Sequence, residues 1–138
     1  ALGEARREGR PVVYANDDPG TWEADAGGLV RRALAGRGGA LVAPLAPRPG
    51  EPVLLKPRYS AFDDTPLATV LREREVEELE VAGTATEMCV FQTVTDALRL
   101  GFEPTVLADA CATVDVANEA LALDYLERVL GVPVRGRA

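Results

Sequence analysis

The most informative stretch of this chain is ELEVAGTATEMCVFQTVTDALRL, residues 78–100. Its start, Glu78–Ala82, is a short run with apolar residues that predicts a strand, and Gly83 begins a turn. Its second part predicts a helix over Glu87–Leu100, because apolar residues recur there at helical spacing. The residues predicted for the buried face of this helix are Val90, Val94, Ala97 and Leu98. The stretch is therefore a strand–turn–helix unit.

Short apolar runs and helical patterns alternate on both sides of this unit, which is typical of βαβ units around a parallel sheet. The other predicted strands are Pro11–Asn16, Val53–Leu55, Thr105–Ala108 and an edge strand at Val132–Val134. The other predicted helices are Ala26–Ala35, Thr65–Arg74 and Ala117–Leu130, whereas Gly36–Pro52 is rich in Gly and Pro and predicts a loop. We therefore predict a three-layer α/β fold, with a Rossmann-like, mostly parallel sheet covered by helices on both faces.

Polar and reactive groups collect at the ends of the predicted strands. Asp17, Lys56 and Asp109 each end or follow a strand, and Cys89 comes one short turn after another. In open α/β sheets, ligands bind beyond the carboxyl ends of the strands. We therefore expect a ligand site at this edge of the sheet.

The chain begins with ALGEARREGR, residues 1–10, which predicts the last part of a helix that leads into the first strand. A doubly wound sheet usually has a strand before such a helix, so we expect a strand upstream of Ala1. The length of 138 residues is that of one domain. We therefore predict a single domain over residues 1–138 that is incomplete at its N-terminus.

The composition excludes several classes of partner. Fifteen Lys and Arg stand against 22 Asp and Glu, giving a net charge of −7, whereas a nucleic-acid backbone requires clustered positive charge. The apolar runs are far shorter than the roughly 18 residues of a membrane-spanning helix, and no secretory signal is seen. Two cysteines are too few for a disulfide scaffold. We therefore expect no nucleic-acid or membrane partner, and a location in the reducing cytoplasm.

Two features of the composition bear directly on chemistry. The chain has no histidine, which excludes Ser-His-Asp and Cys-His catalysis and most catalytic zinc sites, so we expect no metal ligands. Of the 15 basic residues, one is Lys56 and the remaining 14 are arginine. A lysine ammonium is compact and responds strongly to burial, unlike a guanidinium. The single lysine is therefore a candidate functional residue.

Cys89 is predicted to lie in the first turn of the helix after the strand. Thr84 or Thr86 is placed to cap this helix, and Thr84 with Glu87 has the spacing of a capping box. The helix dipole and a nearby lysine both stabilise a thiolate, and first-turn N–H groups can donate to an oxyanion. The alternative is that Cys89 packs in the core, as free cysteines usually do. Cys111 has no such setting, so we expect it to be a packing residue.

Two motifs carry a resemblance to a known family. GTATEMCV, residues 83–90, resembles the nucleophile motif of the isochorismatase-like cysteine hydrolases, which include nicotinamidases and N-carbamoylsarcosine amidohydrolases. KPRYSAF, residues 56–62, resembles the lysine motif of the same family, and the order and separation of the two motifs agree. Residues 13–17 and Asp109 are similar to family strand ends. The resemblance covers residues 11–130, nearly the whole chain.

The resemblance implies an Asp-Lys-Cys triad. Cys89 would be the nucleophile, and Lys56 the lysine that stabilises its thiolate and the charged intermediate. Thr84–Ala85 would be the peptide bond that the family holds in cis, and the Ala85 and Cys89 backbone would form the oxyanion hole. The implied reaction is attack on an amide-type carbonyl, release of ammonia or an amine, and hydrolysis of the acyl-enzyme by water.

One departure from the family concerns the catalytic base. The family's Asp lies at the end of its first strand, and this sequence contains no counterpart, so the resemblance implies that the Asp lies upstream of Ala1. Asp17, Asp18 and Asp109 are the alternative bases in this sequence, although each is also an ordinary turn-forming acid.

A second departure concerns the activity within the family. Nicotinamidases resemble one another in a His-containing metal site near the strand end where Asn16 and Asp17 lie here, and this chain has no histidine. We therefore disfavour a zinc-dependent nicotinamidase. Isochorismatase itself cleaves a vinyl ether without needing the cysteine, so Cys89 disfavours that activity too.

Candidate residues for the substrate pocket flank the strand ends. They are Asp17, Trp22 and Phe62, with core packing as the alternative for the two aromatic residues. Arg58 has two interpretations: it pairs with a substrate carboxylate or a partner subunit, or it is a solvated surface arginine.

We predict a cofactor-independent cysteine hydrolase that cleaves a small amide, carbamoyl or related C–N bond through a thioester acyl-enzyme. Its partners would be a small-molecule substrate and, by analogy with the family, further copies of itself in a homo-oligomer, a dimer or higher. The alternative is a non-catalytic α/β binding or scaffold domain that has lost the catalytic base.

Overall fold

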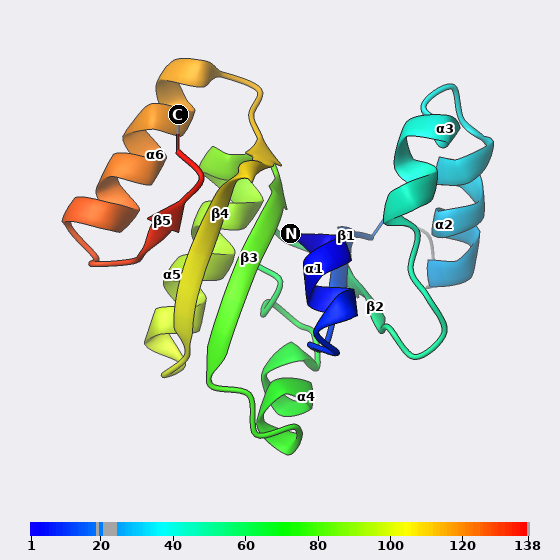
Figure 1. Ribbon diagram of the computed structural model, residues 1–138, viewed down its shortest axis with the longest axis horizontal. Coiled ribbons are helices and arrows are strands. Elements are labelled where there is room, and N and C mark those ends of the chain that lie inside the picture. Colours follow the sequence, from blue (N-terminus) through cyan, green and yellow to red (C-terminus); the bar gives the residue numbers. More distant parts are fainter. Residues whose placement is uncertain (19, 21–24, 138) are drawn as a thin grey trace. The chain divides into compact units, whose positions relative to one another are not determined.

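The computed structural model describes residues 1–18, 20 and 25–137, and the chain forms two compact units. Unit 1 comprises Ala1–Pro57 and unit 2 comprises Arg58–Ala138. Helices and strands alternate in both units, and the strands pair in parallel (Figure 1). These features confirm the predicted α/β class. The prediction of a single domain stays a prediction.

Unit 1 contains a two-stranded parallel sheet, in which β1 (Tyr14–Asp17) lies beside β2 (Val53–Lys56). The first strand starts three residues later than predicted, because its pairing begins at Tyr14, opposite Val53. The helical elements of unit 1 are α1 (Leu2–Arg7), α2 (Ala26–Ala35), α3 (Gly39–Val42) and the 3-10 turn η1 (Ala43–Leu45).

Helix α2 has the bounds predicted for it, and a side-chain cap explains its start. The Asp25 carboxylate accepts a hydrogen bond of 2.7 Å from the Gly28 N–H, which satisfies one of the four unpaired donors at a helix N-terminus.

The prediction of a loop over Gly36–Pro52 is wrong, because α3 and η1 lie within it. A Cβ atom at Gly39 would lie 1.9 Å from the Leu34 carbonyl oxygen, so only a glycine permits this close turn from α2 into α3. The glycines that suggest a loop are therefore needed for a tight helix junction.

A half-buried ion pair ties α1 to the connection before β2. The Arg6 guanidinium, whose side chain is 8% exposed, donates to both Glu51 carboxylate oxygens at 2.8 and 2.7 Å. It also donates to the Ala46 carbonyl at 2.9 Å and to the Tyr14 hydroxyl at 3.1 Å. This hydrogen bonding from Arg6 lowers the pKa of Glu51 to about 2, as expected for a carboxylate in a bidentate pair.

The ion pair between Arg6 and Glu51 predicts that the protein loses stability in acid. The unfolded chain has a Glu pKa of about 4.3, so Glu51 binds a proton in the unfolded state at a higher pH than in the folded state. Its contribution to the free energy of unfolding is therefore complete above about pH 4.3 and is lost as the pH falls towards 2. Glu51→Gln is expected to lower stability at neutral pH and to flatten the acid-induced decline, measured by urea unfolding across this range.

Glu8→Gln is the matched control for that experiment, because Glu8 pairs with Arg10 on the surface and its side chain is 54% exposed. Surface pairs of this kind contribute little to stability. Equal effects of the two substitutions would contradict the role given to Glu51.

Unit 2 contains a three-stranded parallel sheet with the order β3-β4-β5. Its elements in chain order are α4 (Leu67–Glu73), β3 (Glu78–Thr84), the π-helical turn η2 (Thr86–Val90), α5 (Phe91–Arg99), β4 (Glu103–Ala112), α6 (Val116–Arg128) and β5 (Val134–Arg135). The predicted edge strand is confirmed, shifted by two residues at its start and one at its end. Helix α4 starts two residues later than predicted, with Pro66 as its N-cap.

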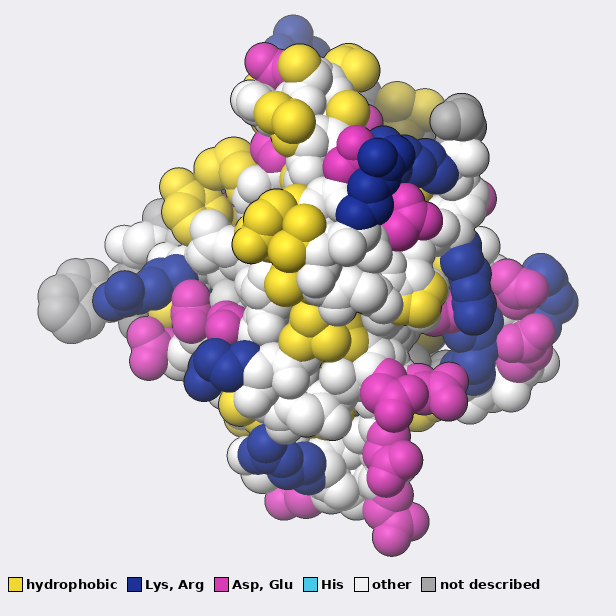
Figure 2. All heavy atoms as spheres, turned by 90° about the vertical axis from the view of Figure 1, so that its left-hand side faces the viewer, with side chains coloured by type: hydrophobic (Ala, Val, Ile, Leu, Met, Phe, Trp, Pro, Cys, Tyr) yellow, Lys and Arg dark blue, Asp and Glu magenta, His cyan; other side chains and the backbone are white. Residues whose placement is uncertain are grey.

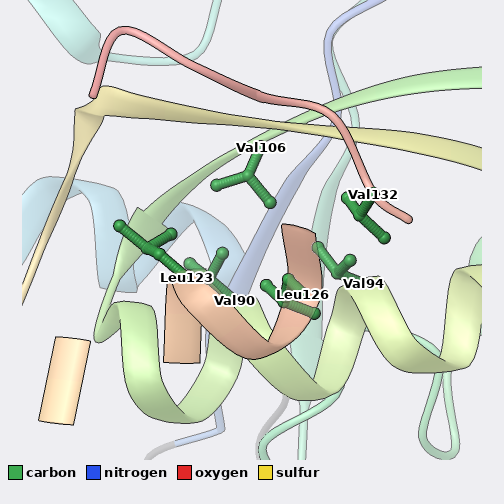
Figure 3. Close-up of a cluster of buried hydrophobic side chains, with 6 residues drawn as sticks. All are labelled: Val90, Val94, Val106, Leu123, Leu126 and Val132. Atoms are coloured by element: carbon green, nitrogen blue, oxygen red, sulfur yellow. The ribbon is translucent and has the colours of Figure 1, made fainter. Parts of the chain in front are cut away.

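The hydrophobic core of unit 2 lies between its sheet and the helices α5 and α6 (Figure 3). Its buried residues come from η2, α5, β4, α6 and the segment before β5, and they are Val90, Val94, Val106, Leu123, Leu126 and Val132. Three of the four apolar residues predicted for the face at 87–100 are buried, whereas Leu98 is 36% exposed. The apolar spacing therefore identifies the side of the helix that faces the core, except that it wrongly includes Leu98.

Strand β4 is much longer than the predicted Thr105–Ala108, and this corrects the placement of Asp109. The strand continues to Ala112, and its pairing with β3 shifts register between Val81 and Gly83. Asp109 therefore lies inside an irregular part of the strand, not at its end. Where strand pairing is irregular, apolar and polar residues do not alternate regularly, so the sequence does not reveal that the strand continues.

Within the described residues, no helix is long and apolar enough to span a membrane.

Candidate functional site

Cys89 lies in a tight turn at the carboxyl end of β3. The strand ends at Thr84, the Thr84–Ala85 peptide bond is cis, and η2 starts at Thr86. The cis form is the one that the resemblance implies for this bond. The Cys89 side chain is half-buried and forms no disulfide. The structure thus places the cysteine in the first turn after a strand, where parallel α/β folds bind ligands.

This turn is π-helical, not the first turn of an α-helix. The Val90 N–H donates to the Ala85 carbonyl five residues back, at 3.2 Å, and the Met88 N–H donates to the same oxygen at 3.1 Å. Single π-helical turns are rare and are frequent at functional sites. Cys89 therefore lies in a π-helical turn, and the regular helix α5 begins only after this turn, at Phe91.

The prediction that Thr84 or Thr86 caps this helix is wrong. The turn has no side-chain cap, because Thr84 belongs to β3 and Thr86 turns its hydroxyl elsewhere. The Thr86 side chain is fully buried, and its oxygen lies 2.7 Å from Glu119 Oε1 and 3.2 Å from the Ala112 carbonyl oxygen. The residue is used for tertiary contact instead of local capping.

Glu87 makes a second set of contacts with the same neighbouring segment. Its carboxylate accepts from the Thr113 hydroxyl at 2.8 Å and from the Val114 N–H at 3.2 Å. A hydrogen bond from the Glu87 backbone N–H and then the one from Thr113 lower the pKa of this carboxyl. The turn that carries Cys89 is therefore held at two consecutive residues.

Sequence patterns do not reveal Thr113 and Glu119 as parts of this arrangement. They lie 26 and 33 residues away from Glu87 and Thr86 along the chain. No local spacing links residues so far apart. Only the packing of α6 against η2 brings them together.

Lys56 ends β2 in unit 1 and lies beside Asp17 at the end of β1. The Lys56 side chain is 4% exposed, and its ammonium contacts the Asp17 carboxylate. The two strands are parallel, so their carboxyl ends lie at the same edge of this sheet. The structure thus brings together two of the predicted site residues within unit 1.

The remaining candidate residues have more ordinary positions. The Phe62 ring stacks on Phe102, with 5.7 Å between the ring centres, which is the packing interpretation. Asp18 closes a turn by accepting from the Gly20 N–H at 3.0 Å, and Arg58 is exposed. Trp22 lies outside the described residues.

Cys111 is half-buried and packs against the core cluster of unit 2. Burial raises the pKa of its thiol, with the charge of Glu119 adding to the effect. A cysteine in this setting is a poor nucleophile at neutral pH. This supports the packing role predicted for it.

An open hollow of about 650 Å³ lies between η2 and α6. Figure 2 views the side of the molecule that carries α6, and hydrophobic side chains gather there. Two hydrophobic residues of α6 that line the hollow, Leu121 and Tyr125, are 69% and 49% exposed. Met88 lines the hollow, whereas Cys89 is absent from its described lining. We therefore do not assign this hollow to the substrate.

The match to a family model spans almost the whole chain. The model, described as an isochorismatase domain, matches residues 1–137. The chain belongs to the isochorismatase family. This isochorismatase-family chain is similar to the uncharacterized isochorismatase family protein YaaI of Bacillus subtilis, with 32% identity over 126 residues. The aligned region covers 91% of this chain and 70% of YaaI.

Solved structures of several relatives share this fold. An isochorismatase family protein from Desulfovibrio vulgaris matches with a TM-score of 0.79 and 31% identity, covering 96% of this chain and 74% of that one. N-carbamoylsarcosine amidase from Thermoplasma acidophilum has a TM-score of 0.74 and 30% identity, with coverage of 96% and 76%. The Staphylococcus aureus nicotinamidase has a TM-score of 0.76 and 25% identity, with coverage of 97% and 78%. Together with the family match, they identify the chain as an isochorismatase-family hydrolase.

The end of β1 does not fit the His-containing metal site that the resemblance implies for nicotinamidases. The chain has no histidine, and the Asp17 carboxylate is engaged by Lys56. In the part of the chain that the structure describes, no three His, Cys, Asp or Glu side chains cluster as metal ligands would.

Proposed function

We propose that this protein hydrolyses a small amide, carbamoyl or related C–N bond, with Cys89 as the nucleophile. The observation that carries the proposal is the position of a half-buried Cys89 in the turn after β3, in a chain matched over residues 1–137 by the family model. Two solved relatives, a nicotinamidase and an N-carbamoylsarcosine amidase, are named for substrates with such bonds.

The proposed reaction has two stages. The Cys89 thiolate attacks the substrate carbonyl carbon, and an S–C bond forms as the carbonyl electrons move to oxygen. The C–N bond then breaks, and the nitrogen leaves as ammonia or an amine after it takes up a proton. Water attacks the resulting thioester, which releases the acid and restores the thiol.

Backbone donors are proposed to stabilise the oxyanion of both stages. They are the N–H groups of Ala85, which directly precedes η2, and of Cys89, which lies within η2. Donors fixed before the reaction stabilise the developing charge without reorganising, which is usually the largest electrostatic contribution to such catalysis. The contacts of Thr86 and Glu87 with residues 112–119 support a fixed turn here.

Lys56 is proposed to stabilise the Cys89 thiolate and the charged intermediate. Its burial and its position at the end of β2 support a role for its charge, since an ammonium that only meets solvent is normally exposed. For the base, we propose an aspartate, as the family resemblance implies for the end of a first strand. Asp17, which contacts Lys56, is the alternative within this chain.

A substrate screen with two readouts tests this proposal. The natural full-length protein is incubated with primary amides and carbamoyl compounds, including nicotinamide and N-carbamoylsarcosine. We expect release of ammonia from at least one class, without added metal, and a quenched acyl adduct on the peptide that contains Cys89. Neither ammonia nor adduct from any compound, with binding of a compound retained, would instead favour a non-catalytic binding domain.

We also predict where the protein is located and that it self-associates. We propose a cytoplasmic location, because a chain with only two cysteines suits a reducing compartment. Self-association into a homo-oligomer is expected by analogy with the family, and sedimentation of the natural protein checks it.

A further inference from the structure

The start of η2 depends on distant residues for its position. No side-chain cap holds this turn, although helix starts normally gain stability from one. Its first residue, Thr86, is completely buried. A buried hydroxyl needs a hydrogen-bond partner, so whatever binds Thr86 also fixes where the turn begins.

Thr86 has two oxygen neighbours, and its hydroxyl has only one hydrogen to donate. Glu119 Oε1 lies at 2.7 Å and the Ala112 carbonyl oxygen at 3.2 Å. Hydrogen bonds to a carboxylate are shorter and stronger than those to a neutral acceptor. Glu119 is therefore the main acceptor for Thr86.

Glu119 is itself well fixed. It lies in the first turn of α6, where the Asp115 carboxylate caps the helix by accepting from the Ala117 and Asn118 N–H groups at 2.8 and 3.2 Å. The same helix is anchored in the core of unit 2 by Leu123 and Leu126, which are 5% and 0% exposed. The position of Glu119 is therefore fixed by α6, and the hydrogen bond from Thr86 ties the start of η2 to this helix.

We propose that Glu119 is a positioning residue for Cys89, acting through the Thr86 hydroxyl. The inference rests on the proposed function of Cys89 as the nucleophile. Glu119 fixes the first residue of η2, three residues before Cys89, and so sets where the sulfur lies relative to the backbone donors. A misplacement of about 1 Å at a reacting group lowers rates by up to roughly a hundredfold. The Glu87 contacts with Thr113 and Val114 hold the next residue of the turn and add to this effect.

The test compares Glu119→Ala with Glu119→Gln. A glutamine side chain still offers an oxygen to the Thr86 hydroxyl, whereas alanine offers none. We expect Glu119→Ala to slow iodoacetamide labelling of Cys89 about tenfold at neutral pH, with the thermal transition much less affected. Labelling of Cys111 should not slow, because removing the Glu119 charge removes one cause of the raised pKa of that thiol. Glu119→Gln should restore most of the Cys89 rate. A merely structural role would not produce this selective loss and rescue.

Two further variants give matched comparisons. Glu127→Ala removes another α6 carboxylate, which pairs with Arg137 on the surface and is 45% exposed, and it should leave the Cys89 rate unchanged. Thr86→Ser keeps the hydroxyl and should label like the wild type, whereas Thr86→Val should label like Glu119→Ala. Equal labelling of Cys89 in the wild type and Glu119→Ala would overturn the proposal.

Amide hydrogen exchange separates this proposal from the proposed function. If wild-type Cys89 labels no faster than Cys111, the nucleophile role fails, and exchange at residues 86–90 then decides the positioning role. Faster exchange confined to this turn in Glu119→Ala would support it. Unchanged exchange there would overturn it.

Discussion

Cys89→Ala is expected to abolish hydrolysis of whichever compound the substrate screen identifies, lowering kcat at least about a thousandfold. Without the sulfur there is no atom to form the thioester, and water alone must attack the amide. The fold should persist, because Cys89 is half-buried and is not a member of the core cluster of unit 2. Steady-state kinetics and circular dichroism on the same preparations check both parts.

Cys111→Ala is the matched control, because it removes the other thiol of the chain. Cys111 packs against the core cluster, so its loss should cost about 1 kcal/mol of stability while kcat stays close to the wild-type value. Activity that survives in Cys89→Ala and disappears in Cys111→Ala would reverse the assignment.

Lys56→Ala is expected to slow labelling of Cys89 at neutral pH about tenfold and to lower kcat by roughly a hundredfold or more. In the proposed mechanism, removing the ammonium withdraws the charge that would favour the thiolate and the oxyanion of the intermediate. The effect on kcat should be larger than that on labelling, because alkylation involves the thiolate alone. Labelling followed by mass spectrometry measures the first effect and ammonia release the second.

Two controls separate charge from packing at this position. Lys56→Arg keeps the charge but changes its shape, so it should label faster than Lys56→Ala while remaining impaired in turnover. Arg32→Ala removes an exposed cation from α2 and should change neither measurement. If Lys56→Ala and wild type label Cys89 at the same rate, the lysine has no influence on the thiol.

Local patterns in the sequence account for much of the observed secondary structure. Helix α2 has the predicted bounds because Asp25 caps it through contacts that lie within three residues. Val90, Val94 and Ala97 are buried as their spacing predicts. Caps and helical spacing act over a few residues, so they can be recognised before any tertiary contact is known.

The errors have a common physical cause. The π-helical form of η2, the long irregular β4 and the short helix α3 all depend on backbone that packs against distant segments or closely on itself. Thr86 illustrates this well, since its sequence position suggests a local cap while its hydroxyl binds Glu119 on α6. The preference of a threonine for a local cap is weak compared with the free-energy cost of burying its hydroxyl without a hydrogen-bond partner.

Sequence alone was sufficient to predict the α/β class, the place of Cys89 just after a strand and the family. These follow from periodicity over short segments and from two short motifs whose order and separation along the chain resemble those of the family. The contact of Lys56 with Asp17 and the attachment of Thr86 and Glu87 to residues 112–119 became known only from the folded chain. Those contacts join residues 26 to 39 positions apart. They form because buried polar groups must find partners among whatever the packing of strands and helices brings near.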